Sequence, residues 1–436
     1  MHKHWKVLFL VLALGLIAAA CGDDAVETTT TTAAATTTTA ATTTTAATTT
    51  TAATTTTTGA VEPLLVWADE TRVPVVEAVA AEFEAATGVP IEIEQLSFDD
   101  IRATVRDQAP LGEGPDIFVG AHDWVGEFAA NGTLEPMDLG ARAAEFLPVA
   151  LDAFSYGGSL YGLPYSTETL GLFRNTTLVP DAPATFEDLL AVCDELGDTV
   201  QACLGVPAGD AWGNYWWLSS TGGYIFNYDP ATGYDTTDVG LDNEGAIEGF
   251  TFFDGLVKDG YLDPAMTWDI QRDLFANGNM AFVVDGPWQT GAWDEAITAG
   301  TLPGYAATPI PEILGNPAAP FLGVQGFMVN AFSEQKALAL TFVLDYIATE
   351  DVMVALFEAG GRPPAHLAAF AAVGDDPNIV AFGEAAATAN PMPNIPEMSS
   401  VWTYLANAVA AIYNQTADPT TALTEAAAGV RAELGG

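Results

Sequence analysis

The chain has 436 residues, and 49% of them are apolar. Because single domains usually contain about 100 to 200 residues, this length predicts a globular protein with two sizeable cores. Asp and Glu outnumber Lys and Arg by 57 to 12, which gives a formal net charge of -45. Such a charge repels phosphate backbones and anionic lipid surfaces, so we expect a hydrated, soluble surface and no nucleic-acid partner.

Residues 1–20 have the pattern of an export signal. A basic start at His2 to Lys6 precedes an apolar run from Val7 to Ile17 and several small residues. The run ends at Cys21 in "IAAACGDD", which resembles the lipobox of bacterial lipoproteins. That resemblance implies an extracytoplasmic protein anchored to the cell membrane by a lipidated Cys21. Since Ala18 replaces the commoner Leu, secretion without a lipid is the alternative.

The segment 21–61 predicts a disordered tether behind that cysteine. From Thr28 onward it consists almost entirely of Thr and Ala, and it cannot bury enough apolar surface to offset its ordering entropy. As a random coil the 34 residues from Thr28 to Val61 would span roughly 30 Å on average, and about 110 Å at full stretch.

The next segments predict an α/β sheet with parallel strand pairs. The apolar run Leu64 to Ala68 and the alternating run Ile91 to Gln95 have strand length. Between them, Val76, Val79 and Phe83 recur at helical spacing before Gly88, and a third strand follows at "DIFVG", residues 116–120. Ligands of such sheets bind beyond the carboxyl ends of the strands, where Asp69, Glu70, Arg72 and Asp123 would lie.

Later segments predict a hairpin, an extended segment that can cross between two lobes, and another buried strand. The pattern from Tyr156 to Phe173 indicates a hairpin that leads into a long extended segment. Cys193 and Cys203 predict a disulfide in an exported chain, with free thiols as the alternative. In "DLFANGNMAFVVDGPW" we expect a helix that stops at Gly278 and a buried strand that ends at Asp285.

Signatures of catalysis and of cofactor binding are scarce. The sequence contains no H-E-x-x-H pair, nucleophile elbow, phosphate loop or dinucleotide fingerprint, so we expect no enzyme, no metal and no cofactor. Carboxylates are abundant enough that a glycosidase pair is the competing hypothesis, with two of Asp123, Glu168 and Asp210 as acid and base.

Tryptophans beside carboxylates are more informative. Trp212 follows Asp210, Trp268 precedes Asp269, and Trp288 follows "DGP". Trp402 follows "MPNIPE", at what we predict to be the first turn of the last helical region. Flat apolar rings beside hydrogen-bond acceptors suit a sugar, although any single Trp is more often part of a core.

Five motifs, in order along the chain, resemble those of the maltose/maltodextrin-binding proteins of bacterial ABC importers. They are "GEGPDIFVGAHDWVGEFAANGTLEPM" (112–137), "LPYSTETL" (163–170), "GGYIFNYD" with "TTDVGLDN" (222–243), "FANGNMAFVVDGPW" (275–288) and "MPNIPEMSSVW" (392–402). The resemblance runs from about Leu64 to the carboxyl end.

This resemblance implies a two-lobed α/β clamp of the periplasmic-binding-protein type, with three crossings between the lobes. Lobe one would comprise residues 62–166 and 327–372, and lobe two residues 171–321 and 379–436. We expect a monomer that captures maltose, a maltodextrin or a related oligosaccharide by closure and delivers it to the permease and ATPase subunits of an importer. A sugar-binding surface sensor without transport is the alternative.

The resemblance also implies a set of ligand-binding residues. The polar ones are Asp69, Glu70, Arg72, Asp123, Glu168 and Asp210. The stacking ones are Trp212, Trp288 and Trp402, with Trp268 and Met392 at the edge of the cleft.

Four positions depart from the best-known members of the family. Gly120 replaces a Trp, Trp124 an Arg, Thr403 a Tyr and Ala406 an Arg. Because these changes remove or relocate walls of the site, the general function follows from the resemblance more firmly than the identity of the sugar, and trehalose, maltose, longer maltodextrins and other glucosides stay open.

Overall fold

A computed structural model describes residues 61–435 of the chain. The predicted signal segment, Cys21 and residues 21–60 of the predicted tether lie outside the described residues. Within residues 61–435, no helix combines the length and the apolar composition that a bilayer span needs.

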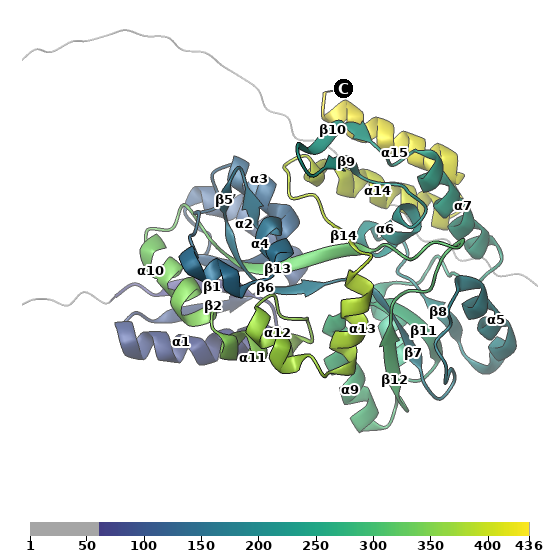
Figure 1. The fold of residues 1–436 in the computed structure, drawn as a ribbon, viewed down its shortest axis with the longest axis horizontal. Helices are drawn as coiled ribbons and strands as arrows, with labels where there is room; N and C mark the ends of the chain where they lie inside the picture. The colour runs from purple at the N-terminus through teal and green to yellow at the C-terminus, as the bar shows by residue number, and fades with distance from the viewer. Residues whose placement is uncertain (1–60, 436) are drawn as a thin grey trace, which may run out of the picture. The chain divides into compact units, whose positions relative to one another are not determined.

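The described part is a mixed α/β structure (Figure 1). Its strands are β1 (Leu64–Ala68), β2 (Ile91–Gln95), β3 (Ile117–Ala121), β4 (Ser155–Tyr156), β5 (Ser159–Leu160), β6 (Gly162–Glu168), β7 (Gly171–Asn175), β8 (Ala202–Gly205), β9 (Phe226–Asp229), β10 (Gly233–Val239), β11 (Met280–Asp285), β12 (Tyr305–Thr308), β13 (Phe321–Val329) and β14 (Asn390–Pro391). Its α-helices are α1 (Val73–Thr87), α2 (Phe98–Gln108), α3 (Val125–Ala130), α4 (Pro148–Ala153), α5 (Phe186–Leu196), α6 (Ala211–Ser219), α7 (Glu244–Lys258), α8 (Trp268–Ala276), α9 (Thr290–Ala299), α10 (Lys336–Thr341), α11 (Glu350–Gly360), α12 (Leu367–Val373), α13 (Pro377–Ala386), α14 (Met398–Tyr413) and α15 (Pro419–Glu433). The short helices are η1 (Ala109–Leu111), η2 (His122–Trp124), η3 (Gly140–Glu145), η4 (Gly197–Thr199), η5 (Pro287–Gln289) and the π-helix η6 (Phe342–Ile347).

The first sheet has the strand order β14-β13-β3-β1-β2, and β6 pairs with β13. Strand β1 is parallel to both β2 and β3, which confirms the parallel pairs predicted from the sequence. Helix α1 covers this sheet through Val76, Val79 and Phe83, and it ends at Gly88 in the left-handed conformation that glycine adopts at little cost. The predicted helix and its stop are therefore confirmed.

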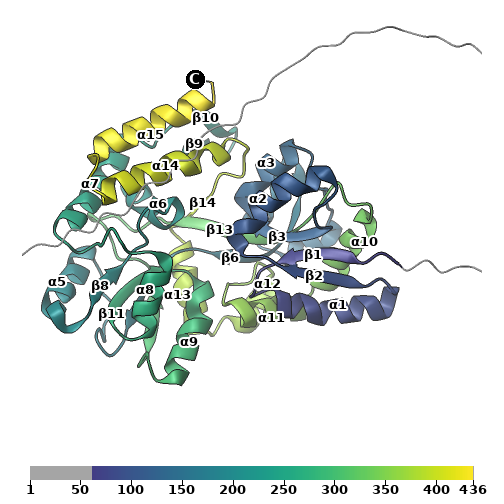
Figure 2. The same cartoon turned by 180° about the vertical axis from the view of Figure 1, so that it is seen from behind.

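The second sheet has the order β12-β7-β11-β8. Strand β7 is antiparallel to β11 and β12, whereas β8 is parallel to β11. The predicted strand at residues 280–285 is confirmed as β11, and all six of its residues are buried. Figures 1 and 2 both show β13 in the middle of the described part, with β1 and β2 on one side and β8 and β11 on the other.

The buried apolar residues divide between the two sheets. Two clusters draw their members from residues 64–165 and 324–369, and two others from residues 170–321 and 382–430. Each sheet therefore has cores of its own, as two sizeable lobes require. The predicted α/β class is confirmed, and the separate cores agree with a two-lobed clamp.

The last part of the chain corrects one prediction. Helix α14 begins at Met398, so Trp402 lies in its second turn, and a further helix, α15, follows. The reason is the apolar period, which starts with buried Met398, Val401 and Leu405, four residues before the position at which we expected the helix to open. Trp402 lies on another face of α14 and is partly exposed.

Cys193 of α5 and Cys203 of β8 form a disulfide across a sequence separation of 10 residues. A bridge over such a short loop restricts the unfolded chain moderately, by about 2 to 3 kcal/mol. We expect the double variant C193A/C203A to lose about that much free energy of unfolding in urea titrations. Reduction should lower the stability of the unmodified protein to the level of the variant, and equal midpoints for oxidised and reduced protein would contradict the assignment.

Candidate ligand-binding site

The turn after β1 carries an almost fully buried ion pair. Arg72 and Asp69 are each 2% exposed, and Nη1 of Arg72 donates to Oδ2 of Asp69. Oδ1 of Asp69 accepts from the backbone and the hydroxyl of Thr71, and Nε of Arg72 donates to the Tyr165 hydroxyl at 2.5 Å. Burial lowers the pKa of Arg72, but Tyr165, Asp69 and Glu168 together raise it further, so the guanidinium is held in its charged form.

Glu168, at the end of β6, is the centre of a second group. Its Oε2 accepts from Nε of Arg362 at 2.6 Å, and its Oε1 accepts from Nε2 of Gln325 at 2.7 Å. The guanidinium of Arg362 lies over the ring of Trp288, 5.3 Å from its centroid. The Trp288 ring in turn lies 5.6 Å from that of Trp212, with both indoles partly exposed. Carboxylate, guanidinium and two indoles thus form one continuous set of contacts.

Local backbone chemistry places the Trp288 ring. The residue lies in η5, directly after buried strand β11, and its ring folds back over Gly286, where a Cβ atom would overlap it. Glycine at 286 therefore allows the indole to lie flat against the chain that precedes it.

Asp123 and Trp402 meet although 279 residues separate them. The indole Nε1 of Trp402 donates to Oδ2 of Asp123 at 3.2 Å. Arg102 of α2 donates to the same oxygen at 3.4 Å and to Glu127 at 2.8 Å. A carboxylate next to the first sheet thus contacts an indole that packs against a core of the second.

Asp210 and Trp268 form the last group that the structure brings together. Asp210 caps α6, because its Oδ1 accepts from the backbone of Gly213. Burial raises the pKa of Asp210, while hydrogen bonds from Gly213 and from the Trp268 side chain act in the opposite direction. Arg272 lies over the Trp268 ring at 4.9 Å.

Two of the predicted site residues stand apart from these groups. Glu70 is exposed, and no hydrogen bond or ion pair to its carboxylate is found within residues 61–435. Met392 is 4% exposed, with its side chain inside an apolar core. Its backbone carbonyl, rather than its side chain, takes part in the polar contacts.

Four residues of these groups were missed by sequence reasoning: Arg102, Tyr165, Gln325 and Arg362. Among the described residues, Nη2 of Arg72, Nη1 of Arg362 and Oε1 of Gln325 are buried without a hydrogen-bond partner. A signal did exist for the arginines. In a chain with only 12 basic residues and 57 acidic ones, each Arg is expected to have a specific carboxylate partner.

Two of the departures from the family pattern, Gly120 and Trp124, are coupled by packing. Trp124 is 5% exposed, and its six-membered ring occupies the space that a Cβ atom on Gly120 would need. The same ring lies 5.2 Å from Phe98 and under Arg102. A small residue at 120 and a large one at 124 therefore fill one volume between them.

Hydrogen bonds hold the "MPNIP" segment (residues 392–396) against the first-sheet side of the molecule. Nδ2 of Asn394 donates to three carbonyl oxygens at the end of α4 and the start of β4, those of Asp152 at 3.2 Å, Ala153 at 2.9 Å and Ser155 at 2.8 Å. His122, fully buried, contacts the Met392 carbonyl through Nε2 at 3.0 Å. These contacts fix the chain just before α14 and hence the direction from which Trp402 reaches Asp123.

His122 also gives a pH dependence. Its Nδ1 accepts from the backbone of Val324, and burial lowers the pKa of its imidazole despite the opposing influence of Asp123. Because the folded pKa lies below the unfolded value of about 6.5, the stability that depends on neutral His122 is intact above that pH and is lost below it.

We expect urea titrations to show a fall in the free energy of unfolding between pH 7.5 and 5.5. The variant His122→Gln should be less stable at pH 7.5 but should lose less on acidification, because it has no imidazole to protonate. Parallel curves for the two proteins would contradict this role of His122.

The amino-acid sequence is similar to that of a known protein family. Residues 78–381 match the model of the bacterial extracellular solute-binding proteins. The chain belongs to this family. The family predicted from the five motifs is thereby confirmed, and membership in a family of extracellular proteins supports the extracytoplasmic location.

Individual relatives carry more specific names. The maltodextrin-binding protein MdxE of Bacillus subtilis is 30% identical over 78% of this chain and 82% of its own length. The galactooligosaccharide-binding protein of the same organism is 26% identical over 85% and 89%, respectively. A maltooligosaccharide ABC transporter solute-binding lipoprotein of Streptococcus pneumoniae is 27% identical over 78% and 82%.

Proposed function

We propose that this protein captures maltose, a maltodextrin or a related neutral oligosaccharide and delivers it to the permease and ATPase subunits of an ABC importer. One observation carries the proposal. Two indoles that pack against a core of the second sheet, Trp288 and Trp402, each contact a polar side chain from the first-sheet side, Arg362 and Asp123. Relatives named for maltodextrin and maltooligosaccharide binding support the sugar class.

The proposed mechanism is closure of two lobes. Lobe one comprises residues 62–166 and 327–372 and lobe two residues 171–321 and 379–436, with crossings at 166–171, 322–326 and 373–378. The long strand β13 (Phe321–Val329) spans the second of these crossings, which supports the division. Lobe one supplies most of the polar groups and lobe two most of the rings, so only a closed form engages both, and bound sugar shifts the population toward closure.

The energetics of this site are adequate for a transport protein. Hydrogen bonds that involve charged groups contribute about 1.5 to 3 kcal/mol each, and stacking on an aromatic ring contributes about 0.5 to 1.5 kcal/mol. After the costs of immobilisation and closure, a micromolar affinity, about -8 kcal/mol, is reasonable. The protein acts as a monomer anchored through lipidated Cys21. The lipid anchor is supported by the pneumococcal relative, which is named a lipoprotein.

Loss of either indole tests the site. We expect Trp288→Ala and Trp402→Ala each to weaken binding of maltotriose at least tenfold in isothermal titration calorimetry, because each removes a stacking surface and a contact between the lobes. Tyr228→Ala is the matched control, since this ring is 56% exposed on the β9–β10 hairpin. Unchanged affinity in both Trp variants would remove the stacking assignment.

We also propose that the protein does not hydrolyse its ligand. Both oxygens of Glu168 accept hydrogen bonds from Gln325 and Arg362, Asp123 is shared by Arg102 and Trp402, and Asp210 caps a helix. Each of these carboxylates already accepts hydrogen bonds from protein groups, which supports a binding role for the site. Maltotriose incubated with the protein for days should be recovered intact by chromatography, and release of glucose or maltose at a rate proportional to protein concentration would refute this.

A further inference from the structure

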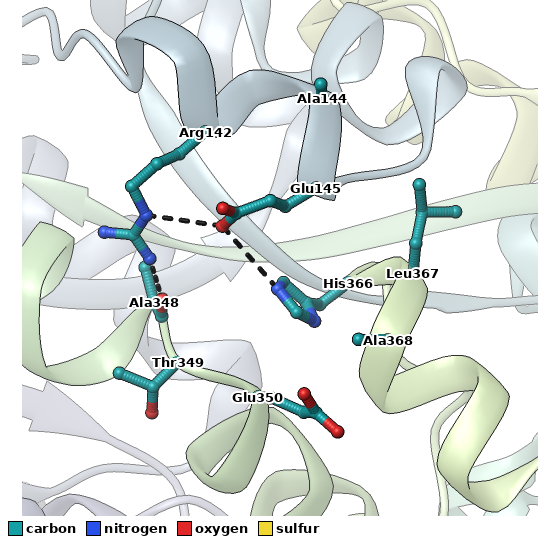
Figure 3. A pocket seen from close by; sticks show the side chains of 9 residues that line it. All are labelled: Arg142, Ala144, Glu145, Ala348, Thr349, Glu350, His366, Leu367 and Ala368. Carbon is teal, nitrogen blue, oxygen red and sulfur yellow. Dashed lines mark hydrogen bonds and ion pairs between the residues drawn. The ribbon is translucent and has the colours of Figure 1, made fainter.

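A pocket of about 490 Å³ lies on the first-sheet side of the molecule, apart from the ligand-binding groups described above (Figure 3). It is formed where η3, the start of α11 and the start of α12 come together. Its size falls in the range of pockets that hold a ligand or a partner's side chain.

The pocket combines apolar walls with two carboxylates. Ala144, Ala368 and half-exposed Leu367 supply the walls, and Glu145 and Glu350 supply the charge. Within residues 61–435, no hydrogen bond or ion pair to the Glu350 carboxylate is found. Such walls accommodate an aliphatic stem, and such carboxylates accept from a cationic head group.

The one basic residue of the lining, Arg142, is engaged elsewhere. Its Nη1 donates to the carbonyl of Leu344 at 2.5 Å and its Nη2 donates to that of Ala348, so the guanidinium closes the end of η6. Only its Nε turns toward Glu145, at 3.3 Å. Arg142 therefore pairs with only one of the two carboxylates and leaves Glu350 uncompensated.

His366 supplies an independent polar group. The side chain is more than nine-tenths buried, and its Nδ1 accepts from the backbone of Ala369, so Nε2 carries the proton of the neutral ring. Nε2 is directed into the pocket, 3.8 Å from Glu145 and too far for a hydrogen bond (Figure 3). This N–H is available to a carbonyl oxygen of an occupant.

The position of His366 links the pocket to the ligand-binding groups. Residues 362–366 run alongside β6, with hydrogen bonds from Thr167 to Pro363 and from Ala365 to Tyr165. Arg362 at one end of this segment contacts Glu168 and Trp288, and His366 at the other end lines the pocket. An occupant of the pocket therefore touches the segment that carries Arg362.

We infer that this pocket is a docking site for a Lys or Arg side chain of the importer's membrane subunits, with a peptide carbonyl of the same partner accepting from His366. The inference rests on the proposed function, because it takes the importer as the partner. Charge complementarity favours a basic segment, since the two carboxylates of the pocket lie on a chain whose net charge is -45.

The test replaces both carboxylates without changing their size. In cells of the source organism that express the full chain, we expect Glu145→Gln with Glu350→Gln to lower uptake of labelled maltotriose about tenfold. Calorimetric affinity of the purified variant for maltotriose should stay within twofold of the unmodified protein. The matched control is Glu295→Gln with Glu425→Gln, which removes two exposed helical glutamates from α9 and α15 and should leave uptake unchanged.

Three outcomes would overturn the inference. The first is uptake by the pocket variant equal to that of the control. The second is a fall in its affinity for sugar together with uptake. The third is binding of free arginine to the unmodified protein that the double variant abolishes while uptake persists. Failure of the proposed function would look different, because the unmodified protein itself would then bind no sugar.

Discussion

The rest of this site depends on the guanidinium of Arg362, whose edge pairs with a carboxylate and whose face stacks on an indole. Arg362 meets Glu168 at 2.6 Å and lies 5.3 Å over Trp288. The planar, permanently charged guanidinium can make both contacts at once, which an ammonium cannot do with the same geometry. Through this residue, the carboxyl end of β6 and the turn after β11 become parts of one surface.

The remaining groups extend the same arrangement. Asp69 and Arg72 compensate each other at the end of β1, so two charges are buried without leaving either one unpaired. At a second place, the Asp123 carboxylate contacts the indole of Trp402 directly. The strongly acidic surface is compatible with this site, because the charges within it are matched locally and a neutral sugar requires no net charge.

Much of the fold could be predicted because local signals and tertiary context agree. The apolar period of α1 predicts a helix, the glycine after it predicts the end of that helix, and the apolar run at residues 280–285 predicts a buried strand. All three features are found. The start of α14 differs from the prediction, because the buried apolar series that sets the helix begins at Met398 and not at Trp402. Period is a better guide to a helix boundary than the size of a single side chain.

The site was predictable only in part, for a physical reason. Residues such as Asp123 and Trp288 stand beside recognisable motifs, whereas Arg102, Gln325 and Arg362 reach the site through strand pairing and helix packing over long sequence separations. The Gly120 and Trp124 exchange is similar, since the two departures make sense only once their side chains are seen to fill one space. Pairing over such distances leaves no trace in local spacing, and composition indicates only that each of the few arginines has an acidic partner.

The role of Arg362 is tested most directly by calorimetry on Arg362→Lys, which keeps the charge and removes the planar fork. If the guanidinium joins Glu168 to Trp288 in the sugar-binding form, maltotriose should bind this variant at least tenfold more weakly than the unmodified protein, with the thermal stability of the free protein little changed. Equal affinity in the two proteins would show that the contact is not needed for binding, and would contradict the central claim.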